Sequence, residues 1–143
     1  MKTLLFTLSI FLFFGCKNIT NEPLLSQSEL FEKMKGTWNP YETVSKDGQV
    51  KKGQFLSFLN TFGSYAGGFK MDKNENYFPV SWIDSSNFII KTDEKGTVTY
   101  SSGEKKLIFN GVWKLEYELE KIDNNDLWIK DESGSVLKME RVQ

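Results

Sequence analysis

The sequence predicts an all-β domain, an antiparallel up-and-down β-barrel of about eight to ten strands with one short N-terminal helix. From Thr37 onward, short apolar stretches alternate with polar turns, and no crossover helix is predicted between them. Two of the turns, Asp47–Gly48 and Asn110–Gly111, have the residue pairs of tight hairpins. Such short connections imply sequential antiparallel pairing, and closure of the sheet removes its exposed edges. A two-sheet sandwich with Greek-key connections is the alternative, because periodicity alone does not distinguish closure from stacking.

The N-terminal residues have the pattern of an export signal. Lys2 precedes about a dozen mostly apolar residues, fewer than the roughly 20 that a membrane-spanning helix needs. Gly15 and the single cysteine, Cys16, follow directly, and this arrangement resembles a bacterial lipoprotein signal. Phe13 and Phe14 occupy the positions where the usual lipobox has Leu and a small residue.

This resemblance implies that the chain is cleaved before Cys16 and that this cysteine is acylated, with palmitate as the expected fatty acid. An anchor of several acyl chains gives stable membrane attachment. We therefore expect a signal peptide at residues 1–15, a lipid anchor and tether at 16–27, and the folded domain at 28–143. The expected location is the cell envelope, at the outer membrane.

One helix is predicted at the start of the domain. Ser26 and Glu29 have the spacing of a capping box, and Gly36 stands where a left-handed residue ends a helix. Three apolar residues share one face of this helix: Leu30, Phe31 and Met34. Because a helix of about two to three turns is not stable alone, we expect it to cover one end of the barrel.

Strands account for the remainder of the domain. The clearest one alternates apolar and charged residues from Trp113 to Glu120, which predicts one buried face and one face in water. Turns rich in Asp, Asn and Gly separate the strands. The other strands are expected, in order, at residues 37–46, 49–60, 64–71, 77–84, 87–92, 97–101, 105–109, 127–131 and 135–142.

The residues Gly36-Thr37-Trp38, between the helix and the first strand, resemble the Gly-x-Trp motif of lipocalins. The last two strands, 127–131 and 136–141, are also similar to those of lipocalin-like domains in small lipoproteins of the Bacteroidota. The resemblance covers residues 28–143 and implies that the early tryptophan packs across the closed end of the barrel. It further implies that Arg141, the single arginine, covers Trp38 through packing and a cation–π contact.

The composition excludes most catalytic chemistry. The 143 residues contain no histidine, which excludes imidazole bases, Ser-His-Asp triads and histidine-containing zinc sites, and an acylated Cys16 cannot act as a nucleophile. Acidic pairs such as Asp123 with Asp126 and Asp131 with Glu132 lie in predicted turns, where carboxylates are solvated. The formal net charge of −1 argues against binding to nucleic acid. We expect no enzyme activity, no cofactor and no metal site.

Aromatic residues make up 15% of the chain and occur in nearly every predicted strand. Inward aromatic side chains either fill a barrel or line a ligand cavity, and the sequence leaves both outcomes open. The candidate lining residues come from the two strands with the clearest alternation, and they are Phe78, Val80, Trp82, Trp113, Leu115 and Tyr117.

These features favour a membrane-tethered binding module that holds a small apolar or amphipathic molecule. The alternative is a protein-interaction role, as an inhibitor, an immunity factor or an accessory subunit of an envelope complex. Residues 60–68 are the candidate contact loop for that role, because Phe62 and Tyr65 lie there among small residues. A cavity filled by side chains would favour the alternative, and an open cavity would favour the small ligand.

Overall fold

The computed structural model describes residues 24–52, 67–82, 87–112 and 114–142. The first element of the described part is helix α1 (Gln27–Met34), and a short 3₁₀ helix, η2 (Thr92–Glu94), precedes the sixth strand. The strands are β1 (Gly36–Val44), β2 (Val50–Lys52), β3 (Gly68–Met71), β4 (Asn76–Trp82), β5 (Phe88–Ile90), β6 (Gly96–Ser101), β7 (Lys106–Asn110), β8 (Lys114–Ile122), β9 (Asp126–Lys130) and β10 (Val136–Val142).

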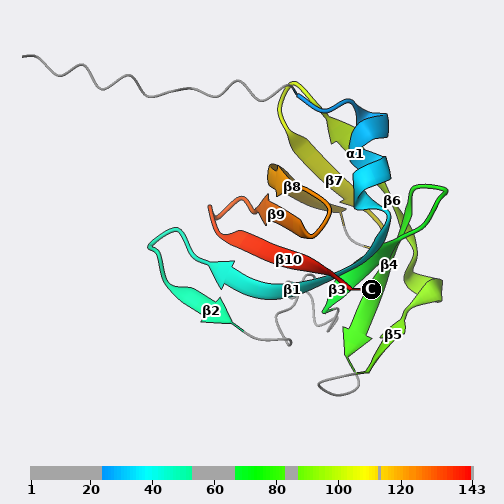
Figure 1. Cartoon of the computed structure of the whole chain (residues 1–143), viewed down its shortest axis with the longest axis horizontal. Helices are drawn as coiled ribbons and strands as arrows, with labels where there is room; N and C mark the ends of the chain where they lie inside the picture. The colour runs from blue at the N-terminus through cyan, green and yellow to red at the C-terminus, as the bar shows by residue number, and fades with distance from the viewer. Residues whose placement is uncertain (1–23, 53–66, 83–86, 113, 143) are drawn as a thin grey trace, which may run out of the picture.

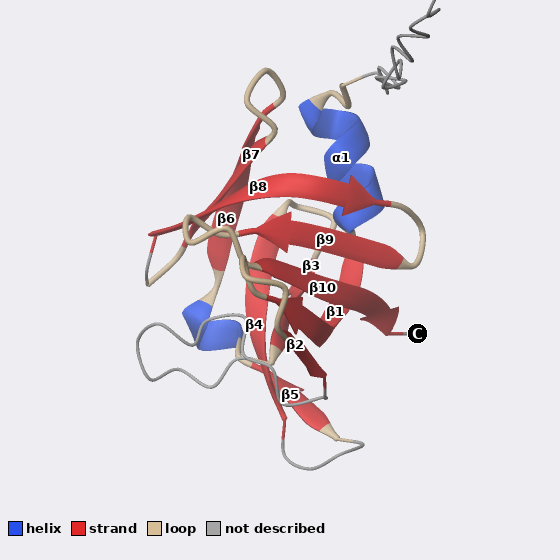
Figure 2. Cartoon of the chain, turned by 90° about the vertical axis from the view of Figure 1, so that its left-hand side faces the viewer, coloured by secondary structure: helices blue, strands red, loops and turns tan. Residues whose placement is uncertain are grey.

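In the described part of the chain, eight strands form a closed ring in which each pairs with two neighbours (Figures 1 and 2). The order around the ring is β1, β3, β4, β6, β7, β8, β9 and β10, and all of these pairings are antiparallel. The seam between β1 and β10 runs the full length of β10, from Val136 opposite Val44 to Val142 opposite Thr37. The short strand β2 pairs with the C-terminal end of β1, and the short strand β5 pairs with the C-terminal end of β4.

This arrangement confirms the predicted all-β, antiparallel fold class with one short helix. The alternation predicted for β8 is present around Leu119, which is buried between the exposed residues Glu118 and Glu120. The strand expected at 49–60 is described only as β2, and its remainder lies outside the described residues together with most of the 60–68 loop.

Helix α1 has the predicted cap. The Ser26 hydroxyl accepts a hydrogen bond from the Glu29 amide at 3.3 Å, and the Glu29 carboxylate accepts one from the Ser26 amide at 2.8 Å. The apolar face of the helix is buried in the main core and covers the end of the ring where β1 begins (Figure 2). The largest of the almost fully buried side chains are Leu30, Phe31, Met34, Trp38, Phe69, Met71, Tyr77, Leu107, Phe109, Leu127, Ile129 and Met139.

Arg141 joins the helix to the first and last strands. Its guanidinium lies over the ring of the buried Trp38, 4.3 Å from the centroid, which is the contact that the lipocalin resemblance implies. Its nitrogens donate hydrogen bonds to the carbonyls of Lys33 at 2.6 Å, of Asn124 at 2.7 Å, and of Lys35. The bonds to Lys33 and Lys35 satisfy carbonyls at the C-terminal end of α1, which have no partner within the helix, and the bond to Asn124 ties Arg141 to the turn between β8 and β9.

Gly36 makes this arrangement sterically feasible. Its φ of +113° lies in a region that other residues rarely adopt. A Cβ at this position would lie 2.6 Å from the Arg141 Nη1 atom. The indole of Trp38 completes the junction by donating a hydrogen bond of 2.8 Å to the Met34 carbonyl.

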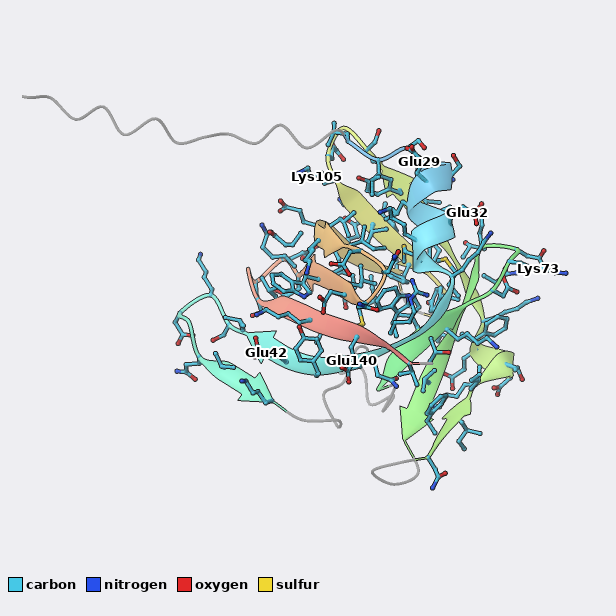
Figure 3. All side chains as sticks on the ribbon, viewed as in Figure 1. Glu29, Glu32, Glu42, Lys73, Lys105 and Glu140 are labelled. Carbon is cyan, nitrogen blue, oxygen red and sulfur yellow. The ribbon has the colours of Figure 1, made fainter. Side chains whose placement is uncertain are left out.

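Charged side chains cover the outside of the ring. Glu42 on β1 and Glu140 on β10 both stand on this outer surface (Figure 3). One cross-strand row runs from Glu42 through Lys138 and Trp128 to Lys121. Lys138 donates to Glu42 at 2.6 Å, and the ammonium groups of Lys138 and Lys121 lie 4.6 and 4.7 Å from the centroid of the Trp128 ring.

We predict that Arg141→Ala lowers the free energy of unfolding by about 2–4 kcal/mol, because it removes three charged hydrogen bonds and a cation–π contact. Arg141→Lys should restore only part of the loss, because an ammonium group cannot reach three carbonyls in the geometry of the guanidinium fork. Urea unfolding followed by tryptophan fluorescence measures both effects. Lys73→Ala, at an exposed turn position, serves as the control with an expected change of less than about 0.5 kcal/mol.

Candidate functional site

The interior of the ring next to α1 is filled by side chains. Three aromatic pairs meet edge to face around Phe109, with centroid distances of 5.3 Å to Phe69, 5.2 Å to Tyr77 and 5.9 Å to Tyr117. Edge-to-face pairs of this kind are favourable and specific in geometry. Tyr117 therefore marks the boundary between this packed core and the far end of the ring, the end away from α1 where β8 and β10 begin.

Two adjoining hollows of about 460 and 490 Å³ lie at that boundary. They share Glu116, Tyr117, Asp131 and Glu132, and we call the combined space the Tyr117 hollow. Its remaining lining residues are Glu104, Lys106, Lys114, Leu115, Glu118, Lys130, Ser133 and Gly134.

The hollow arises because β8 extends further than its neighbour. Strand β8 pairs with β7 from Lys114 to Glu118, but its pairing with β9 begins only at Glu118, opposite Lys130. The first half of β8 therefore faces the turn between β9 and β10 instead of a strand of the described structure. That turn is held by the Asp131 amide, which donates to the Ser135 carbonyl at 2.9 Å, and by the Gly134 amide, which donates to the Asp131 carbonyl at 3.0 Å.

The structure brings together two of the six residues that the sequence nominated as pocket lining. Leu115 and Tyr117 both line the Tyr117 hollow, and both pack against the core. Val80 is fully buried and Phe78 is half-buried on β4, and neither lines this hollow. Trp113 and the side chain of Trp82 lie outside the described residues.

Each lysine that lines the hollow forms an ion pair with a glutamate. Lys106 and Lys114 both contact Glu116, the latter at 2.6 Å, and these contacts lower the pKa of the Glu116 carboxyl to about 2. Lys130 contacts Glu118 at 2.8 Å and Glu120 at 2.5 Å. Glu104, Asp131 and Glu132 have no such lysine contact among the described ion pairs. The wall formed by the β9–β10 turn is therefore acidic.

Tyr117 is the titratable group that lies deepest in the hollow. Burial raises the pKa of its phenol well above the ordinary value, and the nearby negative charge of Asp131 raises it further. The phenol is consequently neutral throughout the physiological pH range.

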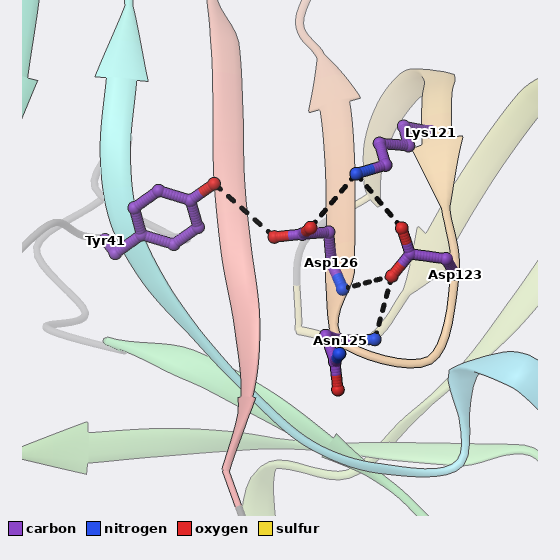
Figure 4. Close-up of polar contacts among 5 residues, drawn as sticks. All are labelled: Tyr41, Lys121, Asp123, Asn125 and Asp126. Atoms are coloured by element: carbon purple, nitrogen blue, oxygen red, sulfur yellow. Dashed lines mark hydrogen bonds and ion pairs between the residues drawn. The ribbon is translucent and has the colours of Figure 1, made fainter.

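A second polar cluster lies on the outer face, in the turn at 123–126 (Figure 4). One oxygen of Asp123 accepts hydrogen bonds from the amides of Asn125 and Asp126, both at 2.8 Å. The Lys121 ammonium lies 3.0 Å from both Asp123 and Asp126, and Tyr41 reaches across β10 toward Asp126. Because the lysine occupies the space between the carboxylates, this cluster stabilises the turn. Within the described residues, no group of His, Cys, Asp and Glu side chains is placed to hold a metal ion.

In the part of the chain that the structure describes, no helix has both the length and the apolar character needed to cross a bilayer.

Comparison with known proteins shows a similarity of fold. No family model matches the chain, and no curated protein matches it. Among solved structures, a lipocalin-like protein from Bacteroides uniformis superimposes with a TM-score of 0.56 at 10% identity, covering 77% of this chain and 99% of that one. An uncharacterized protein from Bacteroides eggerthii superimposes with a TM-score of 0.56 at 9% identity, covering 76% of this chain and 99% of that one. The chain thus resembles a lipocalin-like protein and an uncharacterized protein of Bacteroides, and at these identities the likeness concerns the fold alone.

Sequence reasoning placed Asp131 and Glu132 in a solvated turn and gave them no role. The turn is present, but it packs beside β8 and its carboxylates form one wall of the hollow. No local signal in the sequence marks this contact. It depends on where β9 ends relative to the start of β8, which is a property of the register between strands.

We predict that stability falls at alkaline pH and that Tyr117 contributes to the fall. A folded-state pKa above the unfolded value of about 10 means that burial of the neutral phenol stabilises the fold below pH 10. This contribution is lost as the pH rises through 10 toward the folded pKa. Urea unfolding at several pH values between 8 and 11 should show a shallower alkaline loss for Tyr117→Phe than for the natural chain. Identical pH profiles would contradict the assignment.

Proposed function

We propose that this protein is a lipid-anchored protein of the cell envelope, at the outer membrane, that binds a small apolar or amphipathic molecule in the Tyr117 hollow. The observation that carries the proposal is the hollow itself, with Leu115 and Tyr117 as its apolar floor and charged groups at its rim. Small-molecule sites combine apolar surface with placed polar groups, and in this open recess Leu115 and Tyr117 supply the apolar surface among eight charged lining residues. The lipocalin-like neighbours support the same role by analogy of fold.

The chain enters the described structure close to the hollow. Its first described residue, Leu24, lies in a recess with Lys105 and Leu119. Their neighbours Glu104 and Glu118 line the Tyr117 hollow. From Cys16 to Leu24 the chain spans at most about 30 Å, so an anchor at Cys16 would keep the domain and its hollow near the membrane surface. The proposed activity is binding, without catalysis.

The ligand can be sought directly by native mass spectrometry. The full chain, which carries the expected export signal and Cys16, should be purified gently from the cell envelope of its source. A protein beginning at Lys17 retains every core residue of the described structure and serves for measurements in solution. We expect a reproducible additional mass that disappears on denaturation. An apo mass in repeated preparations would contradict the ligand proposal and would favour the protein-interaction alternative.

A matched pair of variants then locates the ligand. Leu115→Asn places a polar group on the floor of the hollow and should abolish the additional mass. Ile89→Asn changes a residue that is 58% exposed on β5, outside the hollow, and should leave the additional mass unchanged. Thermal unfolding of both variants shows whether the fold is retained. If a folded Leu115→Asn variant kept the additional mass, the ligand would have to bind outside the Tyr117 hollow.

The lipid anchor is tested separately. We predict that cells expressing the full chain incorporate labelled palmitate into the protein and that Cys16→Ala abolishes the label, because no other cysteine is present. The variant should also leave the membrane fraction. Equal labelling of both proteins would contradict acylation at Cys16.

A further inference from the structure

We infer that the Tyr117 hollow selects amphiphiles with a cationic head group, such as an alkylammonium, held by the carboxylates of Asp131 and Glu132. The apolar part of the molecule would lie on Leu115 and Tyr117. This inference rests on the proposed binding function and adds the charge of the ligand to it.

The first argument is the charge of the lining. Five carboxylates and three lysines surround the hollow, so that two negative charges are in excess. The carboxylates are Glu104, Glu116, Glu118, Asp131 and Glu132, and the lysines are Lys106, Lys114 and Lys130. An excess of one sign in a recess attracts the opposite charge more strongly than the same excess on a flat surface.

The second argument is that the positive charges are already engaged. Lys106 and Lys114 both contact Glu116, and Lys130 lies between Glu118 and Glu120. An anionic head group would have to compete with these carboxylates for a lysine. A cationic one would meet Asp131 and Glu132, for which no lysine contact is found among the described ion pairs.

The third argument is that Asp131 is held in place before any ligand arrives. One of its carboxylate oxygens accepts hydrogen bonds from the Ser133 hydroxyl at 2.6 Å and from the Ser135 amide at 3.0 Å. These bonds fix the carboxylate within the β9–β10 turn, and neither of them uses its second oxygen. A preorganised carboxylate loses little side-chain entropy on binding.

The experiment compares two amphiphiles that share one chain and differ in the head group. Dodecyltrimethylammonium and dodecyl sulfate, both below their micellar concentrations, are titrated into the protein beginning at Lys17 by isothermal calorimetry. We expect the ammonium compound to bind about tenfold more tightly at low ionic strength. The preference should shrink as salt rises to about 0.5 M, because the attraction is then screened.

Charge variants identify the residues. Asp131→Asn/Glu132→Gln should remove most of the preference, whereas Asp93→Asn/Glu140→Gln makes the same change in charge at exposed positions outside the hollow and should preserve it. Because Asp131 also holds its turn, Glu132→Lys provides a second variant at an exposed residue. It should shift the preference toward dodecyl sulfate.

The outcomes separate the two proposals. Equal affinity for both amphiphiles, lost together in Leu115→Asn, would overturn the cationic selectivity and leave the binding function standing. Preference for the sulfate would also overturn the selectivity. Binding of neither amphiphile, together with an apo mass of the native protein, would overturn the binding function and the selectivity with it.

Discussion

The guanidinium of Arg141 is the constraint on which the arrangement of this fold depends. It stands on the last strand, lies over the ring of Trp38 on the first strand, and donates to two backbone carbonyls at the C-terminal end of the helix. One side chain thus fixes the β1–β10 seam, the angle at which α1 leaves the ring, and the position of Trp38 in the main core. Gly36 is a consequence of this geometry, because the guanidinium occupies the space that a Cβ would need.

Sealing one end of the ring determines where a ligand can bind. The helix contributes Leu30, Phe31 and Met34 to the same core as the aromatic cluster around Phe109, so the interior next to the helix is filled. Space remains at the far end, because β9 ends before it reaches the first residues of β8, and the chain turns there into β10. The hollow is therefore a product of unequal hairpin lengths, and the packed core forms its floor at Tyr117.

Local patterns in the sequence predicted the parts of the fold that local chemistry decides. The capping box at Ser26, the glycine after the helix and the alternation along β8 all follow from interactions within a few residues. The register between β8 and β9 shifts between Leu119 and Lys121, which places one extra residue in β8. This irregularity had a signal that simple alternation misses: Leu119 and Ile122, which both contact the core, are three residues apart instead of two. The extra residue allows Lys121 to face outward over Trp128. The closure of the ring and the hollow depend on pairing between distant strands, which no local pattern contains.

The distribution of lysines explains why the hollow keeps an excess of negative charge although the chain is nearly neutral. Where strands pair, lysines stand opposite carboxylates across neighbouring strands, as Lys138 does with Glu42 on the outer face and Lys130 with Glu118 at the edge of the hollow. Such pairs need a strand on each side to hold the two groups in register. The β9–β10 turn lies beside β8 but is not paired with it, because the β8–β9 ladder ends at Glu118 opposite Lys130, so Asp131 and Glu132 lie where this pairing ends. The early end of the β8–β9 pairing thus has two effects. It opens the hollow, and it leaves Asp131 and Glu132 without a lysine partner among the described ion pairs.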